Sequence, residues 1–233
     1  MGTNLGSIAE NLRQVRQRID RACTECHRLP SHVTLLAVSK TCPAEAVRVA
    51  WEAGQRAFGE NYVQEALQKI GALADLRAQI EWHLIGPLQS NKTRVVAEAF
   101  DWVHSVDRLK IAERLSDQRP THLPPLNICL QVNVDGEASK SGVDFEALPA
   151  LARSVAALPG LRLRGLMSIP QPAPSPEAQR EPHRRLHEAY EQLRQQGLAL
   201  DTLSMGMSAD LEPAVVEGAT MVRVGSAIFG ARG

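Results

Sequence analysis

The stretch that decides the fold is Leu35-Leu36-Ala37-Val38-Ser39-Lys40-Thr41-Cys42-Pro43. Its apolar first half predicts a buried β-strand, and its polar residues and proline predict the turn that ends the strand. A helical pattern follows over residues 44–53, so the stretch opens a β/α unit. Lys40 then stands at the rim of a sheet, where partial burial can prepare its amine for Schiff-base chemistry. The alternative is a surface lysine at a strand end, since most lysines are exposed.

The same β/α rhythm continues along all 233 residues. Short apolar runs alternate with helical stretches, which is typical of a parallel sheet. We predict eight strands, over Val33–Ser39, Ala57–Gly59, Ile80–Ile85, Trp102–Val106, Leu126–Asn133, Leu161–Ile169, Thr202–Met205 and Met221–Val224. The clearest helical stretches between them are Ala44–Ala53, Tyr62–Leu73, Phe145–Ala157 and His183–Gln196. This order predicts an α/β protein, a single (β/α)8 TIM-type barrel, with a doubly wound open sheet as the alternative.

We expect one domain over residues 1–233, a length that a barrel commonly has. Residues 1–28 carry apolar side chains at helical spacing, and they predict an extra helix packed outside the barrel. Two long loops, residues 135–142 and the proline-rich residues 170–182, follow carboxyl ends of predicted strands. Loops at that end build the active sites of barrels, although the second loop could equally be a flexible surface excursion.

Composition narrows the class of partner. The chain has 26 basic and 26 acidic residues, so no overall field favours nucleic acid or an anionic membrane. No apolar run approaches the roughly 18 residues of a membrane span. The one Cys-x-x-Cys pair, Cys23 and Cys26, lies in a helical stretch without a second pair, so we expect no metal site. These features favour a small-molecule ligand and a cytoplasmic protein with reduced thiols.

Two segments near the end of the chain resemble anion sites. Each runs from a strand through glycine or serine into a helix, and such turns let backbone N–H groups approach a phosphate. They are Leu203-Ser204-Met205-Gly206-Met207-Ser208 and Val222-Arg223-Val224-Gly225-Ser226. Phosphate often binds after strands seven and eight of a barrel, although singly such glycines and serines are usually turn and cap residues. Arg223, inside an apolar strand, needs a partner, which could be a ligand or a structural carboxylate.

In a closed barrel, strand eight pairs with strand one, so the lysine and the two anion segments would meet. A lysine beside a phosphate site suits a phosphorylated aldehyde, and pyridoxal 5′-phosphate (PLP) fits this description. A Schiff-base aldolase acting on a sugar phosphate is the alternative from spacing alone. We expect His83 and His104 to form hydrogen bonds inside the barrel rather than bind metal.

Six motifs, which together span nearly the whole chain, closely resemble the YggS/PROSC family of PLP homeostasis proteins. They are Ala37-Val38-Ser39-Lys40-Thr41, Phe58-Gly59-Glu60-Asn61-Tyr62, Trp82-His83-Leu84-Ile85-Gly86-Pro87-Leu88-Gln89-Ser90-Asn91-Lys92, Gly165-Leu166-Met167-Ser168-Ile169-Pro170, Ser204-Met205-Gly206-Met207-Ser208 and Val222-Arg223-Val224-Gly225-Ser226-Ala227-Ile228-Phe229-Gly230. The resemblance implies a barrel like that of alanine racemase. It also implies a protein that binds, buffers and delivers PLP inside the cell without established catalytic turnover.

The resemblance also implies roles for single residues. Lys40 would form the Schiff base, and Asn61 would lie beside the ring. Arg223 would face the pyridine nitrogen and keep it unprotonated, which weakens the cofactor as an electron sink and suits a carrier. The phosphate would be held by Ser208 and by the backbone of Gly225 and Ser226.

The chain departs from many of these relatives at Cys42, where they carry a second lysine. Lys140 matches a family position and could receive or pass on cofactor, or be a solvated loop lysine. The alternative function is a racemase-like, PLP-dependent enzyme, which needs a second acid/base opposite Lys40. Only Tyr62 and Tyr190 supply tyrosines, so this alternative is disfavoured. We expect a monomer whose partners are PLP and PLP-dependent apo-enzymes.

Overall fold

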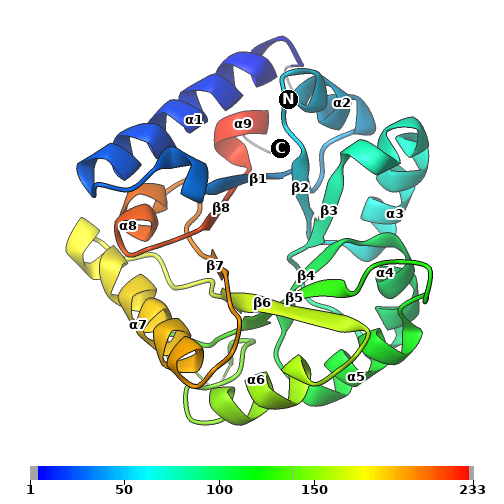
Figure 1. The fold of residues 1–233 in the computed structure, drawn as a ribbon. Helices are drawn as coiled ribbons and strands as arrows, with labels where there is room; N and C mark the ends of the chain where they lie inside the picture. Colours follow the sequence, from blue (N-terminus) through cyan, green and yellow to red (C-terminus); the bar gives the residue numbers. More distant parts are fainter. Residues whose placement is uncertain (1–4, 138, 231–233) are drawn as a thin grey trace.

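The computed structural model describes residues 5–137 and 139–230, and its centre is a ring of eight parallel strands. The strands pair in chain order, and β8 closes the ring on β1 through the pairs from Thr34 with Met221 to Ala37 with Val224 (Figure 1). Their bounds are β1 Thr34–Val38, β2 Ala57–Glu60, β3 Glu81–Leu84, β4 Trp102–Val106, β5 Leu126–Gln131, β6 Leu161–Met167, β7 Thr202–Ser204 and β8 Met221–Val224. The prediction of a closed barrel is confirmed, and the open sheet is wrong.

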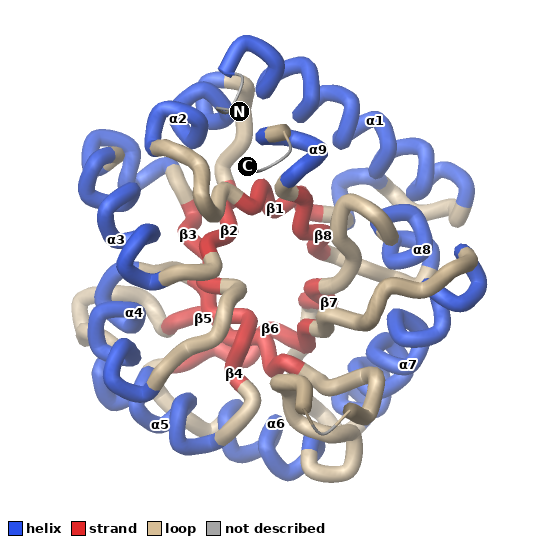
Figure 2. The backbone as a smooth tube through the Cα atoms, turned by 180° about the vertical axis from the view of Figure 1, so that it is seen from behind, coloured by secondary structure: helices blue, strands red, loops and turns tan. Residues whose placement is uncertain are grey.

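Helices surround the ring of strands (Figure 2). In chain order the α-helices are α1 Ile8–Glu25, α2 Ala44–Glu52, α3 Val63–Ala72, α4 Thr93–Ala99, α5 Leu109–Gln118, α6 Leu148–Ala156, α7 Pro176–Gln195, α8 Leu211–Val216 and α9 Ser226–Phe229. The 3-10 turns within the described residues are η1 Leu5–Ser7, η2 Pro30–His32, η3 Ala74–Gln79 and η4 Ser90–Lys92. Among the described helices, none is both long and apolar enough to cross a membrane.

Helix α1 lies outside the barrel, against α2, α8 and α9 (Figure 1). Its buried residues recur every three or four positions, which places them on one stripe that faces these helices. They are Ile8, Leu12, Val15, Ile19, Ala22 and Cys23. The position of α1 agrees with the helix expected over residues 1–28, of which residues 1–4 lie outside the described part. The helix therefore covers the seam where β8 meets β1.

The strands are buried on both faces, as in other parallel sheets covered by helices. Side chains alternate along a strand, so one set packs under the helices and the other fills the inside of the barrel. In β1, Leu35 and Ala37 belong to the large core under the helices, whereas Leu36 and Val38 belong to a small separate cluster. The interior also holds polar side chains, including His83, His104 and Ser204, which carry hydrogen bonds discussed below.

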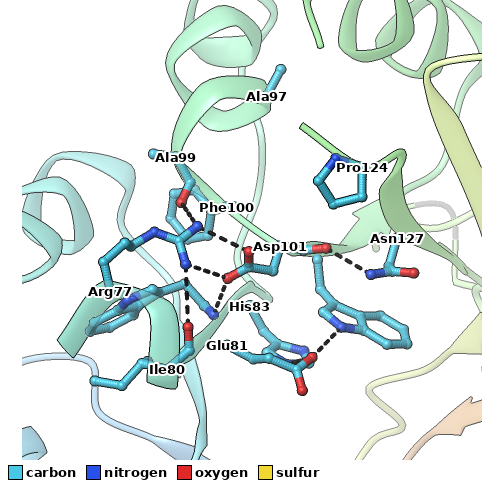
Figure 3. A network of polar contacts seen from close by, with 12 residues as sticks. Arg77, Ile80, Glu81, His83, Ala97, Ala99, Phe100, Asp101, Pro124 and Asn127 are labelled. Atoms are coloured by element: carbon cyan, nitrogen blue, oxygen red, sulfur yellow. Dashed lines mark hydrogen bonds and ion pairs between the residues drawn. The ribbon is translucent and has the colours of Figure 1, made fainter. Parts of the chain in front are cut away.

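A polar network joins strands at the amino-terminal end of the barrel (Figure 3). The carboxylate of Asp101, just before β4, accepts hydrogen bonds from Arg77 and from the backbone N–H of Trp82. The Asp101 carbonyl accepts a hydrogen bond from the Asn127 side chain in β5, at 3.1 Å. This end of the barrel is therefore tied together by residues of the structural frame.

The proline-rich segment differs from the prediction of a loop over residues 170–182. Helix α7 begins at Pro176, seven residues before the predicted start at His183. Ser175 caps the helix by accepting a hydrogen bond from the N–H of Ala178 (3.2 Å), and a proline is well suited to the first helical position. Pro182 lies inside the helix and removes only one backbone donor there.

Candidate functional site

A cavity of about 470 Å³ opens at the carboxyl end of the barrel. It is bordered by Val38 of β1, by Arg223 of β8, by residues that follow β1, β2, β7 and β8, and by Ile85 and Ile169. All six residues predicted to bind a cofactor line this one cavity: Lys40, Asn61, Ser208, Arg223, Gly225 and Ser226. Residues that are up to 186 positions apart in the chain are thus brought together by the closure of the barrel.

A larger cavity, of about 550 Å³, lies at the opposite end of the barrel. Its main charged groups already have protein partners, because Arg164 pairs with Asp201 and Arg28 donates to the carbonyls of Val215 and Ala219. Size alone therefore does not identify the site. The carboxyl end combines an amine with two small-residue loops, and it is the end at which barrels bind their ligands.

The turn that presents Lys40 is held by its neighbours on both sides. Thr41 has a left-handed backbone (φ 63°), a strained state for a residue with a branched side chain. Its N–H donates to Glu65 Oε1 at 2.5 Å. The Ser39 hydroxyl donates to Glu60 Oε1, also at 2.5 Å. These bonds fix the backbone before and after Lys40, so the origin of its side chain is set by the fold.

Lys69 is a second lysine near this turn, and its ammonium group is fully engaged. Nζ donates to the Ser39 carbonyl (2.6 Å), to Glu60 Oε1 (2.8 Å) and to Glu65 Oε1 (2.6 Å). Burial raises the pKa of Glu60, and Lys69 and Ser39 oppose this shift. Lys69 therefore anchors the turn and is not a candidate for the reacting amine. No motif in the sequence singles out Lys69, although Glu65 and Lys69 stand four positions apart on one helical face.

Arg223 is almost completely buried in β8, with 3% of its surface exposed. Nη1 donates to Ser204 Oγ (2.8 Å) and Nη2 donates to the Ser168 carbonyl (2.7 Å). Burial lowers the pKa of Arg223 to about 10, so the guanidinium stays charged at neutral pH. The carboxylate of Asp210 favours this charge, but it bonds to His183 and to the N–H of Met207. The structural carboxylate considered from the sequence is thus not its direct partner.

The two predicted anion segments lie side by side at the edge of the cavity. The hydroxyl oxygens of Ser208 and Ser226 are 3.5 Å apart. Gly206 makes the first segment possible: its φ is +89°, and a Cβ there would come within 2.4 Å of Ala214 Cβ. Its carbonyl accepts a hydrogen bond from the N–H of Arg223, which joins the two segments.

Asp210 stabilises the backbone of the first of these segments. Its carboxylate accepts hydrogen bonds from the Met207 N–H (2.7 Å) and from His183 Nε2 (2.8 Å). Burial alone would raise the pKa of Asp210, but these two donors outweigh it and the pKa is lowered. The carboxylate therefore stays ionised and keeps the backbone beside Ser208 in place.

Helix α1 reaches both segments with its side chains. Arg18 Nη2 donates to the Ser208 carbonyl (3.0 Å), and Arg18 is itself held by Glu212 at 2.7 Å. Asn11 Nδ2 donates to the carbonyl of Ile228, just after Ser226 (2.8 Å). The extra helix thus braces the site as well as covering the seam. No short-range pattern indicates these contacts, which join residues 190 and 217 positions apart.

Asn61 lies across the cavity from these segments, just after β2. Its Oδ1 is buried and has no hydrogen-bond partner among the residues that the structure describes. A buried acceptor without a partner is costly, and a ligand that donates to it removes the cost. Gly86 allows the close approach of the neighbouring loop, because a Cβ there would come within 2.1 Å of the Asn61 carbonyl.

Lys140 and Cys42 stand apart from this arrangement. Lys140 lines a second cavity of about 420 Å³, which shares Asn61, Ile85 and Ile169 with the first. Its Nζ pairs with Asp135 at 2.5 Å. Cys42 is buried beside the turn of Lys40. In the described part of the chain, no group of three or more histidine, cysteine or acidic side chains is placed to hold a metal ion.

Comparison with known proteins identifies the family. The model for the N-terminal domain of alanine racemase matches residues 3–233. A pyridoxal phosphate homeostasis protein of Pseudomonas aeruginosa is 62% identical over 228 residues, which is 98% of this chain and 97% of the relative. A protein of the same name from Escherichia coli K12 is 55% identical over 229 residues, 98% of each chain. The chain belongs to the family of pyridoxal phosphate homeostasis proteins.

Solved structures agree with this membership. PipY of Synechococcus elongatus, determined with PLP bound, superposes with a TM-score of 0.84 at 41% identity. The match covers 96% of this chain and all of PipY. Alanine racemase of Corynebacterium glutamicum shares the fold, with a TM-score of 0.73 at 19% identity. This chain covers 62% of that racemase.

Proposed function

We propose that this chain holds PLP covalently on Lys40 at the carboxyl end of the barrel, and that it buffers and delivers the cofactor. One observation supports this most strongly: a lysine, a buried arginine and two serine-bearing loops converge on one cavity. Bound PLP supplies an aldehyde that reacts reversibly with amines, and a pyridine ring that can withdraw electrons. The family name and the PLP-bound relative point to the same ligand.

The six predicted residues have these roles in the proposal. Lys40 would hold the aldehyde carbon of PLP through its amine, and because this linkage forms with loss of water, water would also release the ligand. Ser208 and Ser226 supply hydroxyls, and the backbone at Gly225 and Ser226 supplies N–H groups, to the phosphate oxygens. Asn61 offers its unpartnered Oδ1 to a donor on the ligand.

Arg223 sets the chemical character of the site. A guanidinium has donors but no acceptor, so it favours an unprotonated pyridine nitrogen opposite it. An unprotonated ring withdraws electrons poorly, which disfavours the carbanion chemistry of transaminases and racemases. This residue therefore supports a carrier without a reaction of its own.

A racemase-like enzyme would need a second acid/base at the face opposite Lys40. The positions of the two tyrosines support the proposal that neither supplies this group. Tyr62 is exposed, at 56% of its surface, and Tyr190 is buried against the Leu200 carbonyl at 3.1 Å. We therefore propose that the chain is not an enzyme. We also propose that it acts as a monomer in the cytoplasm and that its acceptors are PLP-dependent apo-enzymes.

The test of this function has two arms that use the protein loaded with PLP. In the first, the protein is incubated with single L- and D-amino acids, and product is measured over many equivalents of protein. In the second, it is mixed with a PLP-dependent apo-enzyme, and recovery of that enzyme's activity is followed. We expect recovery of activity and no sustained turnover. Sustained turnover would establish the racemase-like alternative, and failure to load the apo-enzyme would refute delivery.

A further inference from the structure

A chain of hydrogen-bonded side chains crosses the inside of the barrel behind Arg223. Arg223 Nη1 donates to Ser204 Oγ at 2.8 Å, and the same oxygen lies 2.8 Å from His104 Nδ1. His104 Nε2 lies 2.9 Å from His83 Nδ1. The four residues belong to β8, β7, β4 and β3, and each has at most 3% of its surface exposed. Bulk water therefore does not compete for these contacts.

The Ser204 hydroxyl links Arg223 to His104. It accepts from Arg223 with one lone pair, and its hydrogen or its second lone pair faces His104 Nδ1, so this second bond runs in either direction with the histidine tautomer. The same tautomer sets the direction between His104 Nε2 and His83 Nδ1. His83 Nε2 has no hydrogen-bond partner among the described residues, and the carboxylate of Glu81 lies 3.8 Å from that atom.

Both histidines are neutral at physiological pH. Burial lowers the pKa of His83 to about 3, and the charge of Arg164 acts in the same direction. Burial also lowers the pKa of His104 well below its ordinary value, with further contributions from His83 and Arg223. The His83 ring stacks on Trp102, with centroids 5.1 Å apart and planes at 10°, which fixes its orientation. Within this chain of side chains the positive charge is therefore carried by Arg223 alone.

We propose that Ser204 and His104 are positioning residues that hold Arg223 as a hydrogen-bond donor toward the ring nitrogen of bound PLP. This inference rests on the proposed function, in which Arg223 faces that nitrogen. A guanidinium has only donors, so Ser204 accepts from it in either tautomer of His104, and the contact with His104 holds the Ser204 hydroxyl in place. The Ser168 carbonyl also only accepts, at 2.7 Å.

Arg223 then donates hydrogen bonds to Ser204 and Ser168 on one side and to the ring nitrogen on the other, and it keeps its positive charge. A ring nitrogen that meets this group can only accept a hydrogen bond. The protein thus sets the protonation state of the ring from residues on β7 and β4 that do not border the cavity. The orientation of Arg223 specifically requires a hydrogen-bond acceptor at position 204, because without it the guanidinium is free to rotate.

The test uses PLP labelled with ¹⁵N at the ring nitrogen and the full-length protein. The ¹⁵N resonance and the Kd for PLP are measured for wild type, Ser204→Ala, Ser204→Thr and His104→Gln. Arg223→Gln serves as the reference for a ring nitrogen without its partner. Ser105→Ala is the matched control, because Ser105 is the next residue of β4, is buried, and has an Oγ without a partner in the described part of the chain.

We expect Ser204→Ala to move the ¹⁵N resonance toward the Arg223→Gln position and to raise the Kd about tenfold, as for loss of a hydrogen bond to a charged group. Ser204→Thr retains the hydroxyl and should keep the wild-type resonance, as should Ser105→Ala. His104→Gln should lie between the two extremes. A wild-type resonance in Ser204→Ala, with Arg223→Gln shifted, would overturn this inference alone. If the wild-type protein gave no bound ¹⁵N signal, the proposed function itself would fail.

Discussion

Replacing Lys69 with methionine tests how the turn of Lys40 is held. Methionine keeps the unbranched apolar part of the side chain but removes a cation whose three hydrogen bonds are all made inside the protein. The carboxylate of Glu60 is completely buried and would lose its counter-charge. Breaking a buried pair in this way costs about 3–5 kcal/mol. Glu65 is partly exposed and adds little, so we expect the free energy of unfolding to fall by about 4 kcal/mol at pH 7.

The pH dependence of the free energy of unfolding tests this prediction independently. Burial already raises the pKa of Glu60, and without Lys69 it rises further. A carboxyl with a raised folded pKa destabilises the folded state at neutral pH, and this cost disappears as falling pH protonates the group. The gap between wild type and Lys69→Met should therefore narrow on acidification from pH 7. Glu60→Gln in the Lys69→Met background removes the buried charge and should recover part of the loss.

Urea unfolding followed by circular dichroism measures these differences, with Glu65→Gln as the control that leaves the buried pair intact. PLP binding by Lys69→Met should weaken together with stability, because Ser39 loses the donor to its carbonyl. A loss below about 1 kcal/mol would place Lys69 among surface ion pairs and refute the reasoning. A double variant, Glu60→Gln with Lys69→Met, that is less stable than Lys69→Met alone would also contradict this prediction.

Three further predictions concern the frame of the site. Arg18→Ala should raise the Kd for PLP about threefold to tenfold, because it removes a hydrogen bond to the Ser208 loop. The control Arg13→Ala, on the exposed side of α1, should leave the Kd unchanged. Equal effects of the two variants would argue against bracing of the site by α1. Gly206→Ala should lower the free energy of unfolding by about 2 kcal/mol or more, measured by urea unfolding. Gly71→Ala, in open space on α3, should leave it unchanged or raise it. The reverse order of the two variants would contradict the left-handed backbone at Gly206. His83 is neutral in the folded protein and protonated when unfolded, so its contribution to stability should fall by about 1.4 kcal/mol per pH unit from near pH 6.5 toward pH 3. In urea unfolding at pH 7, 6 and 5, His83→Phe should therefore lose stability less steeply with falling pH than the wild type.

The barrel and the cluster of site residues follow from local patterns. Each strand is a short apolar run that ends in polar or small residues, and the strand ends of a parallel barrel meet at one face. Once β8 pairs with β1, Lys40, Arg223 and Ser226 have to lie near one another. The residue types at those ends then indicate the chemistry, and the family motifs strengthen it.

The parts that sequence reasoning missed depend on contacts between distant residues. Arg18 bonds to the Ser208 loop 190 positions away, and its own neighbours show only an amphipathic helix. The pairing of His104 with Ser204 spans 100 positions and depends on which strands face each other across the barrel. The start of α7 was misplaced for a local reason: prolines at Pro176 and Pro182 resemble a loop until the cap at Ser175 is recognised.

The identity of the covalently modified residue is the most direct test of the account. The protein is loaded with PLP and reduced with borohydride, which fixes any Schiff base as a stable secondary amine, and its peptides are mapped by mass spectrometry. We expect the modification on Lys40, in the peptide that contains the turn after β1, and its loss from that peptide in Lys40→Ala. Modification of the wild-type protein at Lys140 or Lys69, with Lys40 unmodified, would contradict it.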